Sequence, residues 1–380
     1  MVEYKEYRLG TLCKRFSSGK GISADLINET GIYPVIGGNG LRGYTDTYNF
    51  DGECAVIGRQ GAYCGNVQYF SGKGYMTEHA VVTEPNKENN AKYLTYKLSR
   101  LSLGRLSGQA AQPGLSVTKL ARLRIEMPPK CYQDKVAGIL SAYDSLIEVN
   151  NKRIKVLEQM AENLYKEWFV RFRFPGHESA EFEDGIPKGW EVCKFSTIAN
   201  VLSGGTPSTE HEEYYGGEIP FYTPKDSTDG YYVFETISSL TSEGLAHCNS
   251  RLYPQDTIMI TARGTVGNLN LLAVPMAMNQ SCYALNSDVI HSQYFLFFLI
   301  KREIQKLKKM ASGGVFDTII VDTFNHIKVL KPDEKTITKF DKRVSELMKE
   351  TFILSIQNRN LIKQRDLLLP RLMSGKLEVE

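Results

Sequence analysis

The two halves of this chain resemble each other in the same order along the sequence, and this duplication constrains the fold more than any other feature. The matching pairs are residues 7–12 with 193–198, 65–67 with 267–269, 117–128 with 321–332, and 151–154 with 358–361. The offset between them drifts from 186 to 202, 204 and 207, as loops of different length would produce. A repeated unit of this size predicts two related globules within one chain.

Each half ends in a long helical pattern with apolar residues at seven-residue intervals. The coiled-coil positions that we single out are Leu140, Ile147, Asn150 and Ile154 in the first pattern and Leu347, Leu354, Asn358 and Leu361 in the second. Sustained heptads favour pairing of the two helices over separate packing of each helix on its own globule. The two asparagines are expected to set the register, and Pro370 to kink or end the second helix.

These patterns divide the chain into five segments. They are a first globule at 1–130, a long helix at 131–172, a linker at 173–189, a second globule at 190–332 and a second long helix at 333–380. Apolar runs predict strands at 54–57, 79–83, 257–260 and 280–285, and shorter helices at 91–101 and 292–310. The expected fold class is α+β, with two pseudo-symmetric α/β globules, each followed by a long helix, and the two helices forming an antiparallel coiled coil.

Charge and cysteine content exclude several classes of protein. The 380 residues include 46 basic and 43 acidic side chains, a net charge of +3, which excludes a highly basic tail or an acidic disordered chain. Seven cysteines without a C-x-x-C spacing indicate reduced thiols and neither a disulfide framework nor a zinc site. No apolar run reaches the ~18 residues of a membrane span. We therefore expect a cytoplasmic protein with no membrane partner.

Motifs for catalysis are weak. Residues 38–43 fit G-x-G-x-x-G after a strand-like run, but residues 44–48 do not open the helix that a dinucleotide site requires. The sequence contains no Walker lysine motif, G-x-S-x-G, H-E-x-x-H or N-P-P-Y-type tetrapeptide of amino-methyltransferases. We expect no catalytic residue, no metal site and no cofactor bound by this chain.

Two similar globules on a rigid spacer suit a two-part target, and duplex DNA offers half-sites of that kind. Residues 1–130 include 17 basic and 11 acidic side chains, a net charge of +6, whereas residues 191–332 include 11 and 14, a net charge of −3. Candidate DNA contacts are the Arg, Lys, Gln, Thr and Ser side chains of loops. They are Lys20, Arg42, Arg59, Gln60, Lys73, Gln109 and Gln112 in the first globule, and Thr206, Ser208, Lys225, Arg263, Lys308 and Lys309 in the second.

Several motifs resemble those of the specificity subunits of type I restriction–modification systems. The second half carries Ile186-Pro187-Lys188-Gly189-Trp190, Ser203-Gly204-Gly205-Thr206-Pro207-Ser208, Tyr214-Tyr215-Gly216-Gly217-Glu218-Ile219-Pro220-Phe221, Thr223-Pro224-Lys225-Asp226 and the closing Leu367-Leu368-Leu369-Pro370-Arg371-Leu372-Met373-Ser374-Gly375-Lys376-Leu377. The first half departs from the family's sequence pattern at residues 17–23, where the G-T-P-S motif would stand. Residues 33–40 nevertheless resemble the corresponding segment of the family. The likeness covers about residues 5–377.

The resemblance implies a noncatalytic subunit with two target-recognition domains, each of which reads one half of a bipartite double-stranded DNA site. It implies that the helices set the spacer and dock two methyltransferase subunits, and that restriction subunits with nuclease and translocase activity join them. S-adenosylmethionine, ATP and magnesium are then expected in those partners. Two alternatives are a DNA-modifying enzyme with an unrecognised catalytic centre and a coiled-coil scaffold with two modules that bind something other than DNA.

Overall fold

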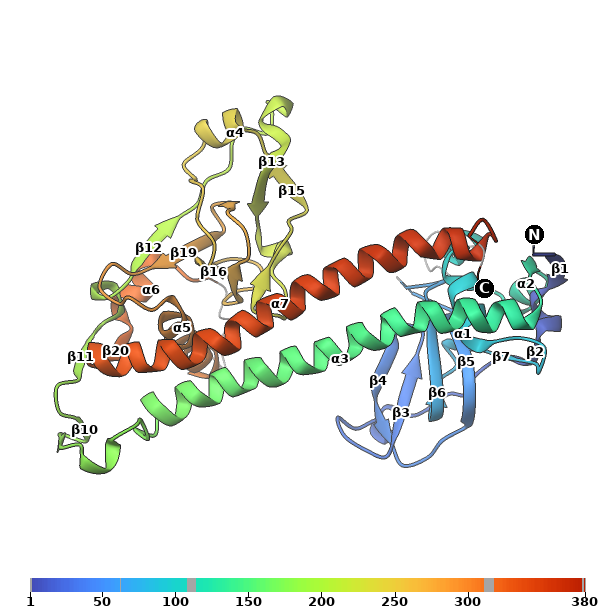
Figure 1. Ribbon diagram of the computed structural model, residues 1–380, viewed down its shortest axis with the longest axis horizontal. Coiled ribbons are helices and arrows are strands. Elements are labelled where there is room, and N and C mark those ends of the chain that lie inside the picture. Colours follow the sequence, from blue (N-terminus) through green and yellow to red (C-terminus); the bar gives the residue numbers. More distant parts are fainter. Residues whose placement is uncertain (1, 62, 108–113, 311–317, 378, 380) are drawn as a thin grey trace. The chain divides into compact units, whose positions relative to one another are not determined.

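The structure, a computed structural model, describes residues 2–61, 63–107, 114–310, 318–377 and 379. The chain forms two compact units: unit 1 comprises residues 1–148 and 359–380, and unit 2 comprises residues 149–358. Each unit contains one sheet-rich globule and one part of each long helix (Figure 1). In the described part of the chain, no helix is long and apolar enough to cross a membrane.

A six-stranded sheet forms the body of unit 1, with strand order β2-β7-β5-β6-β3-β4. The bounds are β2 (Cys13–Ser18), β3 (Tyr33–Gly37), β4 (Gly40–Thr45), β5 (Phe50–Gly58), β6 (Val67–Met76) and β7 (Ala80–Pro85). Along β5, Cys54 and Val56 enter one apolar cluster, and Ala55 and Ile57 enter another. This period of two shows that both faces of the strand are covered. Strands β5 and β7 confirm the strands predicted at 54–57 and 79–83.

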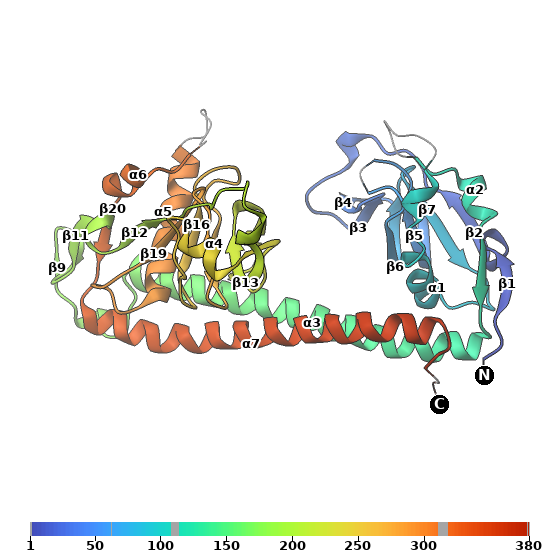
Figure 2. The same ribbon diagram turned by 90° about the horizontal axis from the view of Figure 1, so that it is seen from above.

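Helix α1 (Ala91–Ser99) covers one face of this sheet, as Figure 2 shows. The helix begins at Asn90, whose side chain accepts a hydrogen bond from Tyr93 N, and it buries Tyr93, Leu94 and Leu98 against the sheet. The remaining elements of unit 1 are β1 (Lys5–Arg8), β8 (Arg124–Met127), which pairs with β1, and α2 (Val117–Ala121). Of the G-x-G-x-x-G residues, 38 and 39 form the turn from β3 into β4 and 40–43 lie in β4, so the motif does not open a helix.

Unit 2 contains a five-stranded sheet of order β12-β19-β16-β17-β14 and a three-stranded sheet of order β15-β13-β18. The bounds are β12 (Asn200–Ser203), β13 (Tyr215–Tyr222), β14 (Tyr232–Val233), β15 (Ser238–Leu240), β16 (Ile258–Thr261), β17 (Leu269–Leu272), β18 (Ala277–Met278) and β19 (Cys282–Asn286). Smaller elements are β9 (Phe182–Glu183), β10 (Ile186–Pro187), β11 (Glu191–Lys194), α4 (Ser242–Ala246), α6 (Val321–His326) and β20 (Lys328–Lys331). Helix α5 (Gln293–Met310) packs Phe295 and Phe298 into the main core of this unit.

The duplication inferred from the sequence is present in the hydrogen bonds. Leu9 N donates to Leu123 O in unit 1, and Phe195 N donates to Ile327 O in unit 2, each over 2.8 Å. These residues differ by the offsets of 186 and 204 found in the sequence. The strand pair β1–β8 likewise corresponds to β11–β20 in register, since Arg8 lies opposite Arg124 and Lys194 opposite Lys328. The two globules therefore share this part of their topology, although unit 1 has one six-stranded sheet where unit 2 has a five-stranded and a three-stranded sheet.

The long helices are α3 (Lys130–Phe169) and α7 (Glu334–Met373), and they pack antiparallel. In unit 2, Asn150 Nδ2 donates to Asn358 Oδ1 over 3.0 Å, and Arg153 pairs with Glu350. In unit 1, Arg365 pairs with Asp144 over 2.6 Å. The predicted seam residues Leu140, Asn150, Leu354 and Asn358 are buried, and Ile147, Ile154, Leu347 and Leu361 are half-buried.

Pro370 was predicted to kink or end the second helix, and the helix does not end at this residue. Helix α7 continues to Met373. Proline removes one backbone donor, but so close to the helix terminus that loss affects a single turn. The following turn is closed by Ser374 N, which donates to Pro370 O over 3.2 Å, and by Gly375 N, which donates to Leu372 O over 3.3 Å.

Candidate nucleic-acid interface

In unit 2, a glycine-rich loop lies directly on the backbone that follows β18. A Cβ atom at Gly204 would lie 2.2 Å from Asn279 O, so only glycine allows this approach. Gly205 N donates to Met278 O over 3.2 Å, and the Thr206 hydroxyl donates to the Gln280 side chain. The loop that carries Thr206 is therefore fixed against residues 279–281.

A tight hairpin joins β16 to β17 beside the same backbone. Ala262 N donates to Ser281 O over 2.8 Å, and Gly267 N donates to Thr261 O over 2.8 Å. Gly264 and Gly267 have φ angles of 79° and 77°, which side-chain-bearing residues rarely adopt. The turn leaves the Arg263 side chain exposed at its tip.

A third loop, which contains the short 3-10 helix Pro224–Asp226, joins this group because the Thr265 hydroxyl donates to Pro224 O over 3.4 Å. Lys225 is exposed on it. The neighbouring Asp226 is buried, and its carboxylate accepts hydrogen bonds from Thr223 N and Ile237 N over 2.8 and 2.7 Å. That carboxylate is used internally, so it does not oppose the positive charge of the exposed Lys225 beside it.

Unit 1 builds the same arrangement. A Cβ atom at Gly19 would lie 2.0 Å from Met76 O, and Lys20 N donates to that oxygen over 2.9 Å. Arg59 N donates to His79 O over 2.9 Å. We call these contacting segments the loop cluster of each unit. In unit 1 the loop cluster comprises residues 19–21, 37–42, 58–66 apart from residue 62, and 77–79. In unit 2 it comprises residues 204–206, 222–225, 261–268 and 279–281.

The predicted DNA contacts divide between these clusters and other places. The loop clusters contain Lys20, Arg42, Arg59 and Gln60 in unit 1, and Thr206, Lys225 and Arg263 in unit 2. Lys308 lies on α5 and donates to Gly267 O over 3.2 Å, where partial burial lowers the pKa of its ammonium. Its ammonium therefore supports the hairpin that carries Arg263.

The other candidates are not tied to the clusters by the contacts described. Lys73 lies on β6 with its ammonium 4.9 Å from the centre of the Tyr48 ring. Ser208 accepts a hydrogen bond from Glu210 N, further along its loop. Gln109 and Gln112 lie outside the described residues, as does the side chain of Lys309.

Sequence reasoning missed the segment on which both clusters are built. Residues 76–79 read Met-Thr-Glu-His and residues 278–281 read Met-Asn-Gln-Ser, and Gln280 of the second is exposed beside Thr206. The signal was available, because the offset of 202 that relates Gly65 to Gly267 also relates these two segments. It was overlooked because both segments overlap predicted strands, 79–83 and 280–285, where polar side chains are usually structural.

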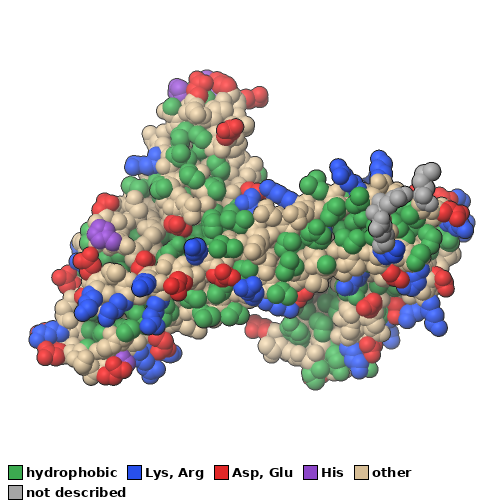
Figure 3. Space-filling view, viewed as in Figure 1, with side chains coloured by type: hydrophobic (Ala, Val, Ile, Leu, Met, Phe, Trp, Pro, Cys, Tyr) green, Lys and Arg blue, Asp and Glu red, His purple; other side chains and the backbone are tan. Residues whose placement is uncertain are grey.

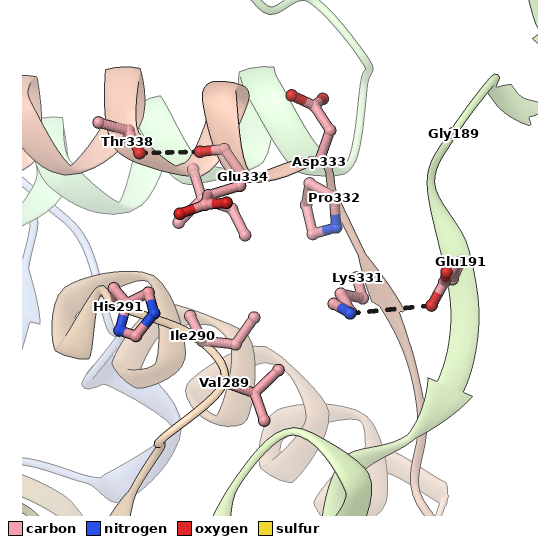
Figure 4. A pocket seen from close by; sticks show the side chains of 11 residues that line it. Gly189, Glu191, Val289, Ile290, His291, Lys331, Pro332, Asp333, Glu334 and Thr338 are labelled. Carbon is pink, nitrogen blue, oxygen red and sulfur yellow. Dashed lines mark hydrogen bonds and ion pairs between the residues drawn. The ribbon is translucent and has the colours of Figure 1, made fainter.

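A pocket at the start of α7 is a less suitable site. Figure 4 shows it between residues 189–191, 289–291 and 331–338. Several of its polar groups are already paired: Lys331 lies 3.8 Å from Glu191, and Asp333 accepts hydrogen bonds from Thr336 N and Trp190 Nε1, each over 2.9 Å. Burial alone would raise the pKa of Asp333, but these hydrogen bonds outweigh it and hold that pKa below its usual range. The pocket joins α7 to its globule.

Comparison with known proteins bears on this arrangement. The family described as "Type I restriction modification DNA specificity domain" matches residues 1–159 and 187–364. The HindI specificity subunit of Haemophilus influenzae is 25% identical over 327 residues, which are 70% of this chain and 71% of that protein. The EcoprrI specificity subunit of Escherichia coli is 40% identical over 166 residues, 43% of this chain and 41% of that protein.

The fold has a solved counterpart. The type I restriction-modification S subunit from M. genitalium superimposes with a TM-score of 0.66 and 18% sequence identity, covering 98% of this chain and 96% of that chain. At this identity the likeness concerns the fold alone. It agrees with two sheet-rich globules and a pair of long helices.

Proposed function

This chain belongs to the type I restriction–modification DNA specificity family, and from that membership we propose that it is the noncatalytic subunit that recognises DNA in such a complex. Each globule reads one half of a bipartite duplex site. The observation that carries this proposal is the duplicated loop cluster, in which glycine-dependent backbone contacts hold exposed Lys, Arg and Gln side chains in both units. The same surface built twice suits a target with two half-sites.

The clusters provide both kinds of contact that DNA recognition requires. Lysines such as Lys20 and Lys225 suit phosphates, which position a protein without reading sequence. Arginine and glutamine form paired hydrogen bonds with guanine and adenine in the major groove. In unit 2 the acidic side chain next to Lys225, that of Asp226, is buried and hydrogen-bonded, so it does not compete with Lys225 for a phosphate.

Catalysis then belongs to partner chains. We propose that two methyltransferase subunits bring S-adenosylmethionine, and that restriction subunits bring ATP and magnesium, in the cytoplasm of a prokaryotic cell. The helices offer a surface for such partners: Val149, Val156 and Met160 lie on one face of α3 in unit 2 and are 51%, 59% and 50% exposed. Apolar side chains are visible among the charged ones on the surface of the protein in Figure 3. Helices of a partner would remove this α3 stripe from water.

The decisive experiment exchanges one recognition domain. The complex of this chain with its methyltransferase partner is expressed, and the methylated motif is determined by sequencing modified bases. Replacing residues 1–130 with the first globule of another family member should change one half of the motif and leave the other half unchanged. A change in both halves, or in neither, would contradict two independent readers.

Two further measurements separate the alternatives. S-adenosylmethionine binding by the isolated chain would favour an enzyme with an unrecognised centre. Absence of salt-dependent DNA binding by the assembled complex would favour a scaffold whose modules bind something else.

A further inference from the structure

The hairpins that follow β5 and β16 correspond hydrogen bond by hydrogen bond. Gly58 N donates to Asn66 O over 2.8 Å, and Thr261 N donates to Asn268 O over 3.0 Å. Gly65 N donates to Gly58 O over 2.8 Å, as Gly267 N donates to Thr261 O. The position of each side chain in one hairpin can therefore be assigned to a position in the other.

The residues that follow fix the assignment. In unit 1, Arg59 N donates to His79 O, and Arg59 O accepts a hydrogen bond from Leu115 N. In unit 2, Ala262 N donates to Ser281 O, and Ala262 O accepts a hydrogen bond from Ile319 N. Arg59 thus corresponds to Ala262 and not to Arg263. The next residue, Gln60 or Arg263, directly precedes a left-handed glycine, Gly61 with φ 83° or Gly264 with φ 79°.

Gln60 and Arg263 therefore occupy the same place in the two recognition units. Both side chains are exposed, whereas Arg59 is half-buried. Neither Gln60 nor Arg263 forms a side-chain hydrogen bond or ion pair with the part of the chain that the structure describes. The side chain at this position differs between the units, a neutral amide in one and a guanidinium in the other, as expected of a position that reads a different base in each half-site.

We propose that Gln60 and Arg263 are the corresponding base-reading side chains of the two half-sites. The amide of Gln60 pairs with the N6 and N7 edge of an adenine, and the guanidinium of Arg263 pairs with O6 and N7 of a guanine. This inference rests on the proposed function and deepens it, because it names the residue and the base in each half.

The test uses the complex of the full chain with its methyltransferase partner and reads the methylated motif by sequencing. Arg263→Gln should replace or relax one guanine in the half-site of unit 2, with at least about a tenfold loss of preference for guanine there. Gln60→Arg should replace or relax one adenine in the other half-site. In each variant the unaltered half and the spacer length should stay the same.

Two substitutions serve as controls. Arg59→Gln, beside the reading position, should lower methylation of all sites alike without changing the motif. Arg173→Gln, on the segment after α3 and outside the loop cluster, should leave rate and motif unchanged. If a variant methylates too slowly to sequence, selection of bound duplexes from a pool randomised in both half-sites measures the same preference.

The outcomes are distinguishable. An unchanged motif in both Arg263→Gln and Gln60→Arg overturns this inference while the wild-type bipartite motif upholds the proposed function. Relaxation of the motif by Arg59→Gln also overturns it, since the reading position would then be the half-buried one. If the wild-type complex shows no bipartite motif at all, the proposed function itself fails.

Discussion

The absence of a Cβ atom at one glycine allows each recognition loop to pack closely on the neighbouring backbone. At Gly204 the added methyl group of alanine would stand 2.2 Å from Asn279 O, an atom of the backbone that cannot turn aside. We expect Gly204→Ala to destabilise unit 2 by about 1–3 kcal/mol, the usual cost of forcing a group into a packed site. The substitution should also displace Thr206 and Gln280, and we expect this displacement to lower methylation at sites read by unit 2.

Tryptophan fluorescence measures this loss of stability, because both tryptophans of the chain, Trp168 and Trp190, lie in unit 2. Gly138→Ala is the control for a methyl group added where space is free, and because Gly138 lies in unit 1 its effect on stability is followed by circular dichroism of the helices and not by tryptophan fluorescence. Gly138 is an exposed residue of α3, and its Cβ would meet nothing within 4 Å, so alanine should stabilise the helix by about 0.5–1 kcal/mol. Equal effects of the two alanines would contradict the steric argument.

Asp333 makes stability depend on pH at the start of α7. Hydrogen bonds from Thr336 and Trp190 lower the pKa of its carboxyl in the folded state. The stabilisation is therefore complete above the ordinary aspartate pKa of about 4 and is lost as pH falls through the lower, folded-state value. The free energy of unfolding of the wild type should exceed that of Asp333→Asn at neutral pH, and the difference should shrink below about pH 4.

Denaturant unfolding at a series of pH values, followed by tryptophan fluorescence, tests this dependence. Glu334→Gln removes the neighbouring carboxylate of the same helical turn and serves as the control. A difference between wild type and Asp333→Asn that stayed constant from pH 7 to about pH 3 would show that the carboxylate is not preferentially ionised in the fold.

At the scale of elements, the helix pair is defined by one polar layer. Asn150 donates to Asn358, which in turn donates to Asn151 Oδ1 over 2.8 Å. Asn358→Ala removes the acceptor of a buried amide and should cost about 1–3 kcal/mol. Replacing Asn150 and Asn358 together with leucine should restore or exceed the original stability, because an apolar pair leaves no buried group without a partner.

A double-mutant cycle from denaturant unfolding measures the coupling between these asparagines. Additive effects of the single and double substitutions would contradict a shared layer. The leucine pair should also loosen the register, which a polar layer fixes. A broader distribution of spacer lengths among methylated sites would report that change in the assembled complex.

The elements were largely predictable from the sequence, and the assembled site was only partly so. Heptads and glycine breaks predicted α3, α7 and the main strands because local periodicity reflects burial directly. The correspondence of Gln60 with Arg263 was not visible, because Arg59 and Arg263 are the hairpin arginines among the predicted DNA contacts and the hairpin of unit 1 is one residue longer after its left-handed glycine. Gln280 was missed because its role depends on a loop 74 residues away in the chain.

At the scale of the whole molecule, we expect the helices to act as a ruler for the spacer between half-sites. One added heptad in α3 between residues 144 and 150, with another in α7 between residues 358 and 365, keeps the seam and the asparagine layer in register. Seven residues at ~1.5 Å add about 10 Å, and at ~3.4 Å per base pair the unread spacer should lengthen by about three base pairs. The half-site sequences should stay unchanged.

Sequencing of the methylated motif measures the new spacer. A heptad inserted in α3 alone is the control, because it separates Asn150 from Asn358 and should abolish specific methylation. An active complex with the paired insertion and an unchanged spacer would show that another part of the assembly determines the separation of the half-sites.

Unit 1 is assembled from both ends of the described chain, and this has a consequence for synthesis on the ribosome. Leu372 and Met373 lie in the same apolar core as Leu9 and Leu140, and Tyr132 donates from its hydroxyl to Leu372 O over 2.9 Å. The globule translated first therefore lacks part of its core until α7 has emerged, while unit 2 holds all of its residues in one continuous stretch, 149–358. Unit 2 can finish folding during translation, whereas unit 1 cannot complete its core before α7 is synthesised, so an incomplete chain exposes the apolar surface that Leu372 and Met373 would cover.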